Sequence, residues 1–374
     1  MQQNQMYQEL IELLTTDAAS GKEAAVADKL VDKLRSLGLQ VTRDCAGEGF
    51  GGECGNVIGV LEGQLDDALL LSAHMDRVPN GLGIRPVETD GILHSSGDTI
   101  LAADDIAGVC AILDGLRRVI ASGKPLPRIE VLFSVGEEIG LQGAKGADLS
   151  AFRAKNGFVF DSPGRIGRFV NAAPGICHLN VEITGRSAHA GNEPEKGINA
   201  AKVMCDILST LRQGRLDEQS TANFPILSTQ TTARNVVCDS ASFRGEARSR
   251  DAALLDAYLT YFEEHCRKTA QAAGAGIHIT VQKNYPPFRI APESRVLTTA
   301  RAACEALGLP FRVEAGGGGM DANVFNGNGM STVGVATGYS KNHTKEEQLV
   351  LEDFLRSGAL CAALIEHYAG GAAR

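Results

Sequence analysis

Histidine and acidic residues follow several predicted strands of this chain, at the points where the strands end, and they are of the types that bind metals. In ALLLSAHMDRV, His74 and Asp76 come after an apolar run, and in RIEVLFSVGEE, Glu137 and Glu138 come after another. Ligands of an open α/β sheet bind at the carboxyl ends of its strands, so residues far apart in sequence can converge there. The candidate set is His74, Asp76, Asp104, Glu137, Glu138, Asp161 and His343.

The charge of this set indicates what it must bind. Carboxylates crowded at one edge of a sheet repel each other and raise each other's pKa unless cations compensate them. Two divalent ions about 3.5–4 Å apart, bridged by a carboxylate and a water, would compensate them and would generate a nucleophile near neutral pH. Imidazoles with carboxylates suit Zn²⁺, Mn²⁺ or Co²⁺. The pattern therefore predicts a two-metal hydrolase.

Each signal also has an ordinary explanation when it is taken alone. The Asp104-Asp105 pair can cap a helix and favour its first turn, and Asp161 in DSPG can belong to a turn. The glutamates can be solvated loop residues, and a lone His343 can be incidental. The repetition of one arrangement, an apolar strand followed by a ligand, favours a built site.

Composition restricts the class of protein. The 374 residues are 44% hydrophobic and 22% charged, which is typical of a soluble globular protein, and the length favours two domains. The net charge of −9 argues against nucleic acid or an anionic membrane as a partner. The nine cysteines form no C-x-x-C pair, and neither a signal peptide nor a membrane span is evident. We expect a cytoplasmic protein with reduced thiols.

Hydrophobic periodicity predicts the elements that must position the candidate ligands. Two helices are expected within 8–37, and a hairpin is expected around Asp90-Gly91. A helix over 105–122 should stop at Gly123. Apolar strands are predicted over 55–61, 68–72, 128–135, 157–160 and 333–336, and a final helix over 351–368. Alternation of such strands with helices predicts an α/β fold with a mostly parallel, helix-covered sheet.

The pattern changes after about residue 178, where strands begin to alternate polar and apolar residues. The expected order is strand 178–185, helix 197–213, strands 226–237 and 241–250, helix 252–273 and strand 276–283. This β-α-β-β-α-β order is ferredoxin-like. We therefore predict an inserted α+β domain over 179–287, with 1–178 and 288–374 forming the metal-binding domain.

Several strings resemble, in order and spacing, the co-catalytic zinc peptidases that include peptidase T and carboxypeptidase G. The strings are SAHMDRV, GDTILAADDIAGV, GEEIGLQGAK and FDSPG, followed by His343. The resemblance covers the whole chain and is strongest to the peptidase T-like branch. It implies that His74 and Asp161 complete one metal site, that Glu138 and His343 complete the other, and that Asp104 bridges both.

The same resemblance implies roles for the remaining candidates. Asp76 would orient His74, Glu137 would be the general base, and a cis peptide would follow Asp104. In GRSAHAGNEPEKGINA, His189 would reach the active site of a second subunit and stabilise the oxyanion. Asn235 and Arg248 would bind the substrate, although Arg248 can equally pair with Glu246 or Asp251. Gly316–Gly319 would face the substrate, since no nucleotide-binding motif accompanies it.

The sequence thus predicts a metal-dependent aminopeptidase or tripeptidase-like enzyme that acts on short peptides. It would hold two divalent ions, Zn²⁺ or alternatively Co²⁺ or Mn²⁺, and would be a homodimer joined through the inserted domain. One alternative is a deacylase or amidase of N-acyl amino acids, and another is a non-catalytic metal-binding scaffold. A free substrate amine distinguishes the first two, and bound metal without hydrolysis would indicate the third.

Overall fold

The chain forms two compact units, which we describe separately. The computed structural model describes residues 2–371. The larger unit contains the chain up to Ala172, Arg289–Gly316 and the chain from Met320 on. The smaller unit contains Ala173–Phe288 and Gly317–Gly319.

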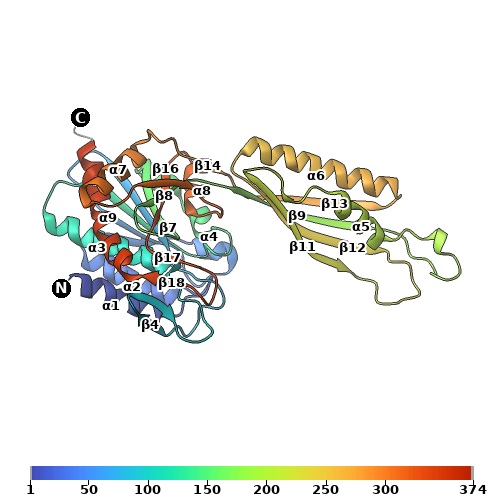
Figure 1. Ribbon diagram of the computed structural model, residues 1–374, viewed down its shortest axis with the longest axis horizontal. Coiled ribbons are helices and arrows are strands. Elements are labelled where there is room, and N and C mark those ends of the chain that lie inside the picture. Colours follow the sequence, from blue (N-terminus) through green and yellow to red (C-terminus); the bar gives the residue numbers. More distant parts are fainter. Residues whose placement is uncertain (1, 372–374) are drawn as a thin grey trace. The chain divides into compact units, whose positions relative to one another are not determined.

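A nine-stranded mixed sheet is the framework of the larger unit (Figure 1). Its order is β1-β2-β6-β3-β7-β16-β8-β14, with β15 paired to β8. Strands β6, β3, β7 and β16 are parallel neighbours, while the pairs β1–β2, β2–β6 and β16–β8 are antiparallel. The strands span Gln40–Arg43 (β1), Val57–Leu61 (β2), Ala68–His74 (β3), Arg128–Ser134 (β6), Asn156–Ser162 (β7), Arg168–Ala173 (β8), Phe288–Arg289 (β14), Arg312–Ala315 (β15) and Ser331–Ala336 (β16).

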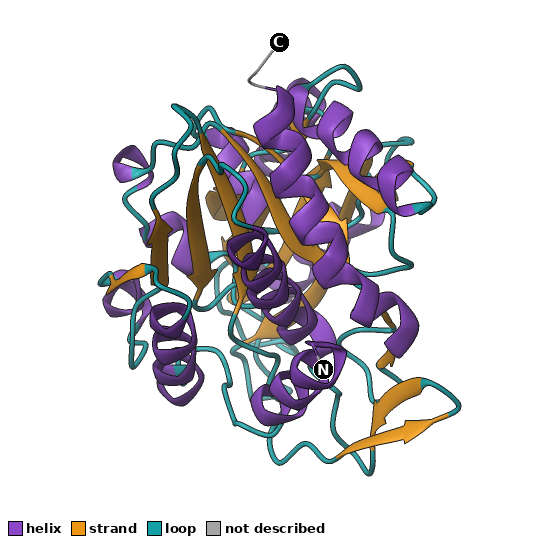
Figure 2. Cartoon of the chain, turned by 90° about the vertical axis from the view of Figure 1, so that its left-hand side faces the viewer, coloured by secondary structure: helices purple, strands orange, loops and turns teal. Residues whose placement is uncertain are grey.

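Helices pack on both sides of these strands (Figure 2). Helix α3 packs on β3 and β7, and α9 packs beside both α3 and α7. The helices span Gln2–Leu14 (α1), Ala24–Ser36 (α2), Ala103–Ser122 (α3), Gln142–Gly146 (α4), Arg295–Leu307 (α7), Asp321–Gly327 (α8) and Leu351–Gly371 (α9), with short 3₁₀ helices η1 (Ala46–Phe50) and η2 (Leu149–Ala151). The mostly parallel, helix-covered sheet predicted from the sequence is confirmed.

Burial on both faces explains why the central strands consist mainly of consecutive apolar residues. All seven residues of β3 are buried, because it lies between two parallel strands and under a helix. Helix α3 ends as predicted at Gly123, whose φ of 65° is left-handed. The predicted turn at Asp90-Gly91 is also present, with φ of 51° and 78°. It joins two strands of a four-stranded sheet ordered β17-β18-β5-β4, which comprise Tyr339–Ser340 (β17), Gln348–Val350 (β18), Ile92–Ser95 (β5) and Pro86–Thr89 (β4).

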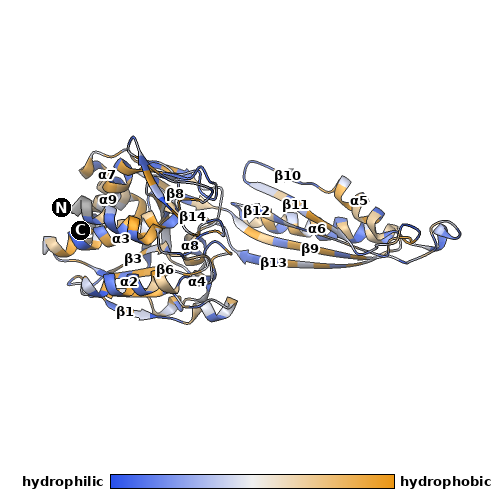
Figure 3. Cartoon of the chain, turned by 90° about the horizontal axis from the view of Figure 1, so that it is seen from below, coloured by the Kyte–Doolittle hydropathy of each residue, from blue (hydrophilic) through white to orange (hydrophobic). Residues whose placement is uncertain are grey.

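The smaller unit has a sheet with helices α5 and α6 packed against it. The sheet order β10-β11-β12-β9-β13 gives the ferredoxin-like arrangement with one short added strand. Hydrophobic and hydrophilic residues alternate along its long strands (Figure 3). The elements are Gly175–Thr184 (β9), η3 (Pro194–Lys196), Ala200–Thr210 (α5), Gly214–Arg215 (β10), Ser220–Thr229 (β11), Ser240–Ser249 (β12), Ala252–Ala272 (α6) and Gly276–Tyr285 (β13).

The strand predicted over 226–237 was wrong in its bounds. The observed strand, β11, begins at Ser220, and its pairing with β12 is irregular between Asn223 and Ile226, so Pro225 is accommodated at a bulge. Val236, by contrast, forms only an isolated bridge with His189. A proline is unusual inside a strand, so Pro225 disfavours a strand prediction there. The apolar pair Val236-Val237 favours one, although these residues lie outside β11.

No helix in the described part of the chain is both long and apolar enough to cross a membrane. All nine cysteines are free thiols, and five of them are buried.

A stacked aromatic cluster should carry much of the stability of the smaller unit. The ring centroid of the buried Phe262 on α6 lies 5.5 Å from that of Phe224 and 6.5 Å from that of Phe243. Phe262→Ala should lower the free energy of unfolding by about 3–5 kcal/mol, because it removes a buried ring and leaves a cavity. Leu254→Ala, at an exposed position of the same helix, should change it by less than about 0.5 kcal/mol. Urea unfolding followed by circular dichroism measures both, and equal effects would contradict the packing described.

Candidate metal centre

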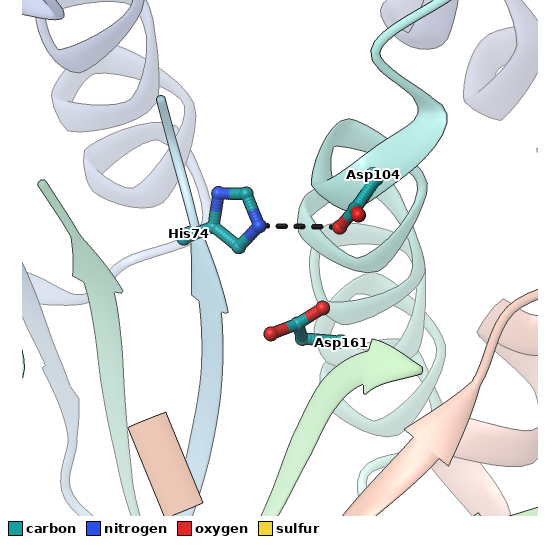
Figure 4. Close-up of side chains that lie close together, drawn as sticks. All are labelled: His74, Asp104 and Asp161. Atoms are coloured by element: carbon teal, nitrogen blue, oxygen red, sulfur yellow. Dashed lines mark hydrogen bonds and ion pairs between the residues drawn. The ribbon is translucent and has the colours of Figure 1, made fainter. Parts of the chain in front are cut away.

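The candidate ligands from the larger unit meet at the carboxyl ends of its central strands, and Figure 4 shows three of them, His74, Asp104 and Asp161. His74 is the last residue of β3, opposite Ser134 at the end of β6, and Asp161 lies at the end of β7. Asp104 opens helix α3, where its backbone is not yet helical and a cis peptide bond joins it to Asp105. The parallel register of three neighbouring strands therefore brings these side chains together.

Two groups of three side chains each have ligand atoms within 4.8 Å of one another, and Asp104 belongs to both. In the first group, His74 Nε2 lies 3.2 Å from Asp104 Oδ1, and the Asp161 carboxylate completes the group. In the second, His343 Nε2 lies 2.9 Å from Glu138 Oε1 and 3.4 Å from Asp104 Oδ2. Imidazole nitrogens with carboxylate oxygens, one of which can bridge, form a donor set that fits two divalent cations.

Asp76 contacts the opposite side of the His74 ring. Its carboxylate Oδ1 lies 3.4 Å from His74 Nδ1, and its backbone carbonyl lies 3.0 Å from the same nitrogen. Asp76 is fully buried, and Ser20 donates a 2.6 Å hydrogen bond to its Oδ2. These contacts fix the orientation of the imidazole and direct Nε2 toward Asp104.

The loop that carries Glu137 is held by side chains at four consecutive backbone amides. Val135 N donates to Asn56 Oδ1 at 3.0 Å, and Gly136 N donates to Glu23 Oε1 at 3.0 Å. The amides of Glu137 and Glu138 donate to the two carboxylate oxygens of Asp76, at 2.9 and 3.2 Å. All three acceptor residues are completely buried.

Glu347 holds the second ligand-bearing loop in the same way. Its buried carboxylate accepts hydrogen bonds from the amides of Leu101 and Ala102, both at 2.9 Å, and from that of Asp104 at 3.1 Å. Glu347 lies four residues after His343, so this contact ties the His343 loop to the Asp104 loop. Sequence reasoning missed it, because one acid in the polar run TKEEQ carries no distinguishing signal.

Two further side chains orient ligands. Tyr339, which is fully buried, donates from its hydroxyl to Asp161 Oδ1 at 3.0 Å. Asn342 donates to Asp104 Oδ2 at 2.7 Å. Neither residue was predicted, since both functions depend on how the loop after β16 folds back.

The electrostatics of the cluster are those of crowded acids. Burial and the nearby charge of Asp161 raise the pKa of Glu137 well above its usual range. Burial and the charge of Asp104 likewise raise the pKa of Asp161 to about 8. Hydrogen bonds to Asp104 and Glu138 raise the pKa of His343 to about 10. These buried acids therefore favour positive charge beside them, which is the requirement that divalent cations would satisfy.

The candidates in the smaller unit fall into two places. His189 and Asn235 lie on adjacent loops. The amide of Ala190 donates to the carbonyl of Asn235 at 2.9 Å, and the backbones of His189 and Val236 form an isolated β-bridge. Arg248 lies near the other end of β12 and donates to Glu246 at 2.6 Å, the pairing that the sequence left open. The eight residue-to-residue steps from Ser240 to Arg248 span about 27 Å of extended strand. The structure therefore does not bring Arg248 to His189 within one chain.

The side chain of His189 is exposed, and its ring has a defined hydrogen-bonding pattern. Nδ1 accepts hydrogen bonds from the amides of Gly191 at 3.2 Å and Asn192 at 3.1 Å. A nitrogen that accepts cannot carry the proton, so the neutral imidazole must carry it on Nε2. His189 therefore presents a hydrogen-bond donor at its outer edge.

In Gly316–Gly319, the sequence predicted a backbone that approaches a ligand closely. At Gly319 a Cβ atom would lie 2.2 Å from the hydroxyl oxygen of Tyr285, whereas Gly317 and Gly318 face open space. Glycine is thus required at Gly319 by a neighbouring side chain of the smaller unit.

Comparisons with known proteins identify the family. Residues 70–367 match the model of peptidase family M20/M25/M40, so the chain belongs to this family. It is 34% identical to the uncharacterized protein YqjE of Bacillus subtilis, over 98% of this chain and 99% of that protein.

Two solved structures are similar over almost the whole chain. The aminopeptidase PepT from Bacillus cereus is 35% identical with a TM-score of 0.92, and a tripeptidase from Staphylococcus aureus is 28% identical with a TM-score of 0.93. Each comparison covers 98% of this chain and 99% of the other. The chain is a peptidase T-like member of the family and a metallo-exopeptidase, as the sequence resemblance predicted.

The contacts of Glu347 predict an effect on stability. Glu347→Ala would leave three buried amides without acceptors, so the free energy of unfolding should fall by about 2–5 kcal/mol. Glu346→Ala is a matched control, because the adjacent Glu346 is exposed, and it should change the value by less than about 0.5 kcal/mol. Urea denaturation measures both, and a Glu347 variant as stable as the control would disprove the anchoring role.

Proposed function

We propose that this enzyme removes the N-terminal residue from short peptides with the help of two divalent cations. The observation that carries the proposal is the pair of ligand groups sharing Asp104, next to the buried carboxylate of Glu137. The aminopeptidase and tripeptidase described above support short peptides with a free amine as substrates. The free thiols agree with action in the cytoplasm.

In this proposal, His74 and Asp161 would hold one cation, Glu138 and His343 would hold the other, and Asp104, which belongs to both groups, would contribute to both sites. Zn²⁺ is the expected ion, and Co²⁺ or Mn²⁺ suits the same donors. When bound, the two ions would polarise the scissile carbonyl and lower the pKa of the attacking water. Asp76 keeps the His74 ring oriented through its contacts with Nδ1.

Glu137 is the general base of the proposed reaction. Its carboxylate takes a proton from water as the water oxygen bonds to the carbonyl carbon, and it then passes that proton to the amide nitrogen as the carbon–nitrogen bond breaks. The Glu137 carboxyl is buried next to the ligand-bearing loop, where it can hold a proton between these steps. The four anchored amides around it fix where this carboxylate can reach.

His189 would donate from Nε2 to the oxygen that becomes negatively charged during attack. We propose that it does so in the active site of a second copy of the chain, so that the enzyme works as a homodimer joined through the smaller unit. The separation of His189 from Arg248 along β12 supports this, because one short peptide cannot bridge about 27 Å. Asn235 would act beside His189, and Arg248 would bind a substrate carboxylate.

The first test separates chemistry from metal binding. Glu137→Gln should retain two metal ions per chain and lose about 10²–10⁴-fold in kcat, because the proton acceptor is gone while the ligands remain. Glu138→Gln, which alters the adjacent residue, should instead lose bound metal. Metal analysis together with peptide hydrolysis measures both, and a Glu137 variant with wild-type turnover would refute the assignment.

The second test identifies the substrate class. After chelation and readdition of Zn²⁺, Co²⁺ or Mn²⁺, the enzyme should hydrolyse di- and tripeptides with a free amine and ignore their N-acetylated forms. Chelation alone should abolish hydrolysis. A requirement for the blocked amine would instead indicate a deacylase, and bound metal without hydrolysis of either panel would indicate a non-catalytic scaffold.

A further inference from the structure

Four arginines line a cavity of about 390 Å³ in the larger unit, and none of the candidate ligands belongs to its lining. Its volume is within the usual range of small-molecule sites. Three separate segments build it: the β7–β8 loop, the stretch from Leu309 through β15, and the start of α9. Its charged residues are Arg165, Arg168, Arg312, Arg356, Glu314 and Asp353.

Two of the four guanidinium groups are neutralised within the cavity. Asp353 is almost completely buried, and Arg165 contacts both of its carboxylate oxygens, while the amide of Ile166 donates to Oδ2 at 3.3 Å. Arg168 donates to Glu314 at 2.8 Å. Asp353 thus accepts hydrogen bonds from Arg165 and Ile166 on one side of the cavity.

The other two arginines have no acidic partner among the described residues. Arg312 is exposed, and Arg356 is half-buried with only a long 3.3 Å hydrogen bond to the carbonyl of Leu307. The cavity therefore carries two more positive than negative groups, in a chain whose net charge is −9. Guanidinium groups that line one cavity repel each other, and an anion bound in that cavity would relieve the repulsion.

We propose that this cavity, the arginine pocket, binds a small polyvalent anion, namely a phosphate ester or a dicarboxylate. Guanidinium groups donate paired hydrogen bonds that match the oxygens of both anions. Ile166 and Leu309, which are both buried, add an apolar wall against which the carbon skeleton of such a ligand can pack. The site is additional to the proposed peptidase centre, so either proposal can fail without the other.

The test measures binding directly, by titrating the metal-loaded enzyme calorimetrically with inorganic phosphate and, separately, with malate at constant ionic strength. At least one anion should bind saturably at one site. The double variant Arg312→Ala/Arg356→Ala should bind that anion at least about tenfold more weakly, because two charge-assisted donors are lost. Arg267→Ala removes an exposed arginine of α6 and should bind like the wild type.

Peptide hydrolysis and circular dichroism of the double variant establish that it is folded, since neither arginine belongs to the proposed catalytic machinery. A single Arg312→Lys variant keeps the charge without the paired donors and should bind with intermediate affinity. Absence of saturable binding for both anions, or equal affinity in the wild type and the double variant, would overturn the proposal. Saturation by phosphate alone or by malate alone identifies which anion the pocket accepts.

Discussion

Buried backbone amides must find acceptors, and this constraint shapes the centre of the larger unit. The loops after β6 and before α3 are irregular, so their amides do not find acceptors within a strand or a helix. Asn56, Glu23 and Asp76 accept from one loop, and Glu347 accepts from the other. Because three of these four acceptors are buried carboxyl groups, each loop has one favourable position. The buried polar side chains that hold these loops therefore also fix the positions of the ligands and of Glu137.

The buried carboxyl groups among these side chains also add to the mutual repulsion of the acids in this centre, and the fold alone does not compensate that repulsion. Acids accumulate at one edge of the sheet, and the pKa shifts of Glu137 and Asp161 express their mutual repulsion. Divalent cations would turn this repulsion into attraction, so the geometry that is costly in the protein alone becomes favourable with the metals bound. The arginine pocket presents the opposite imbalance, with unpaired positive groups in an acidic chain.

The sequence predicted the functional residues that stand next to a recognisable local pattern. His74 and Asp161 follow long apolar runs, so periodicity located them, and the family resemblance then assigned their partners. Glu23, Asn56 and Glu347 were not predictable, because an isolated acid or amide looks alike whether it is solvated or holds a buried loop. The bounds of β11 were wrong for a related reason, since a bulge at Pro225 depends on its pairing with β12 rather than on local propensity.

The contact between Glu347 and the amide of Asp104 joins residues 243 positions apart in the chain. A ribosome releases the chain from its N-terminus, so β3, β6, β7 and α3 emerge long before the residue that anchors the start of that helix. Contacts of such large sequence separation also require costly loop closure and slow folding. The pairing of β3 with β6 and β7 can therefore form early, but the ligand cluster can reach its final geometry only after Glu347 has emerged. A newly made chain would remain inactive until Glu347 has reached the loop before α3.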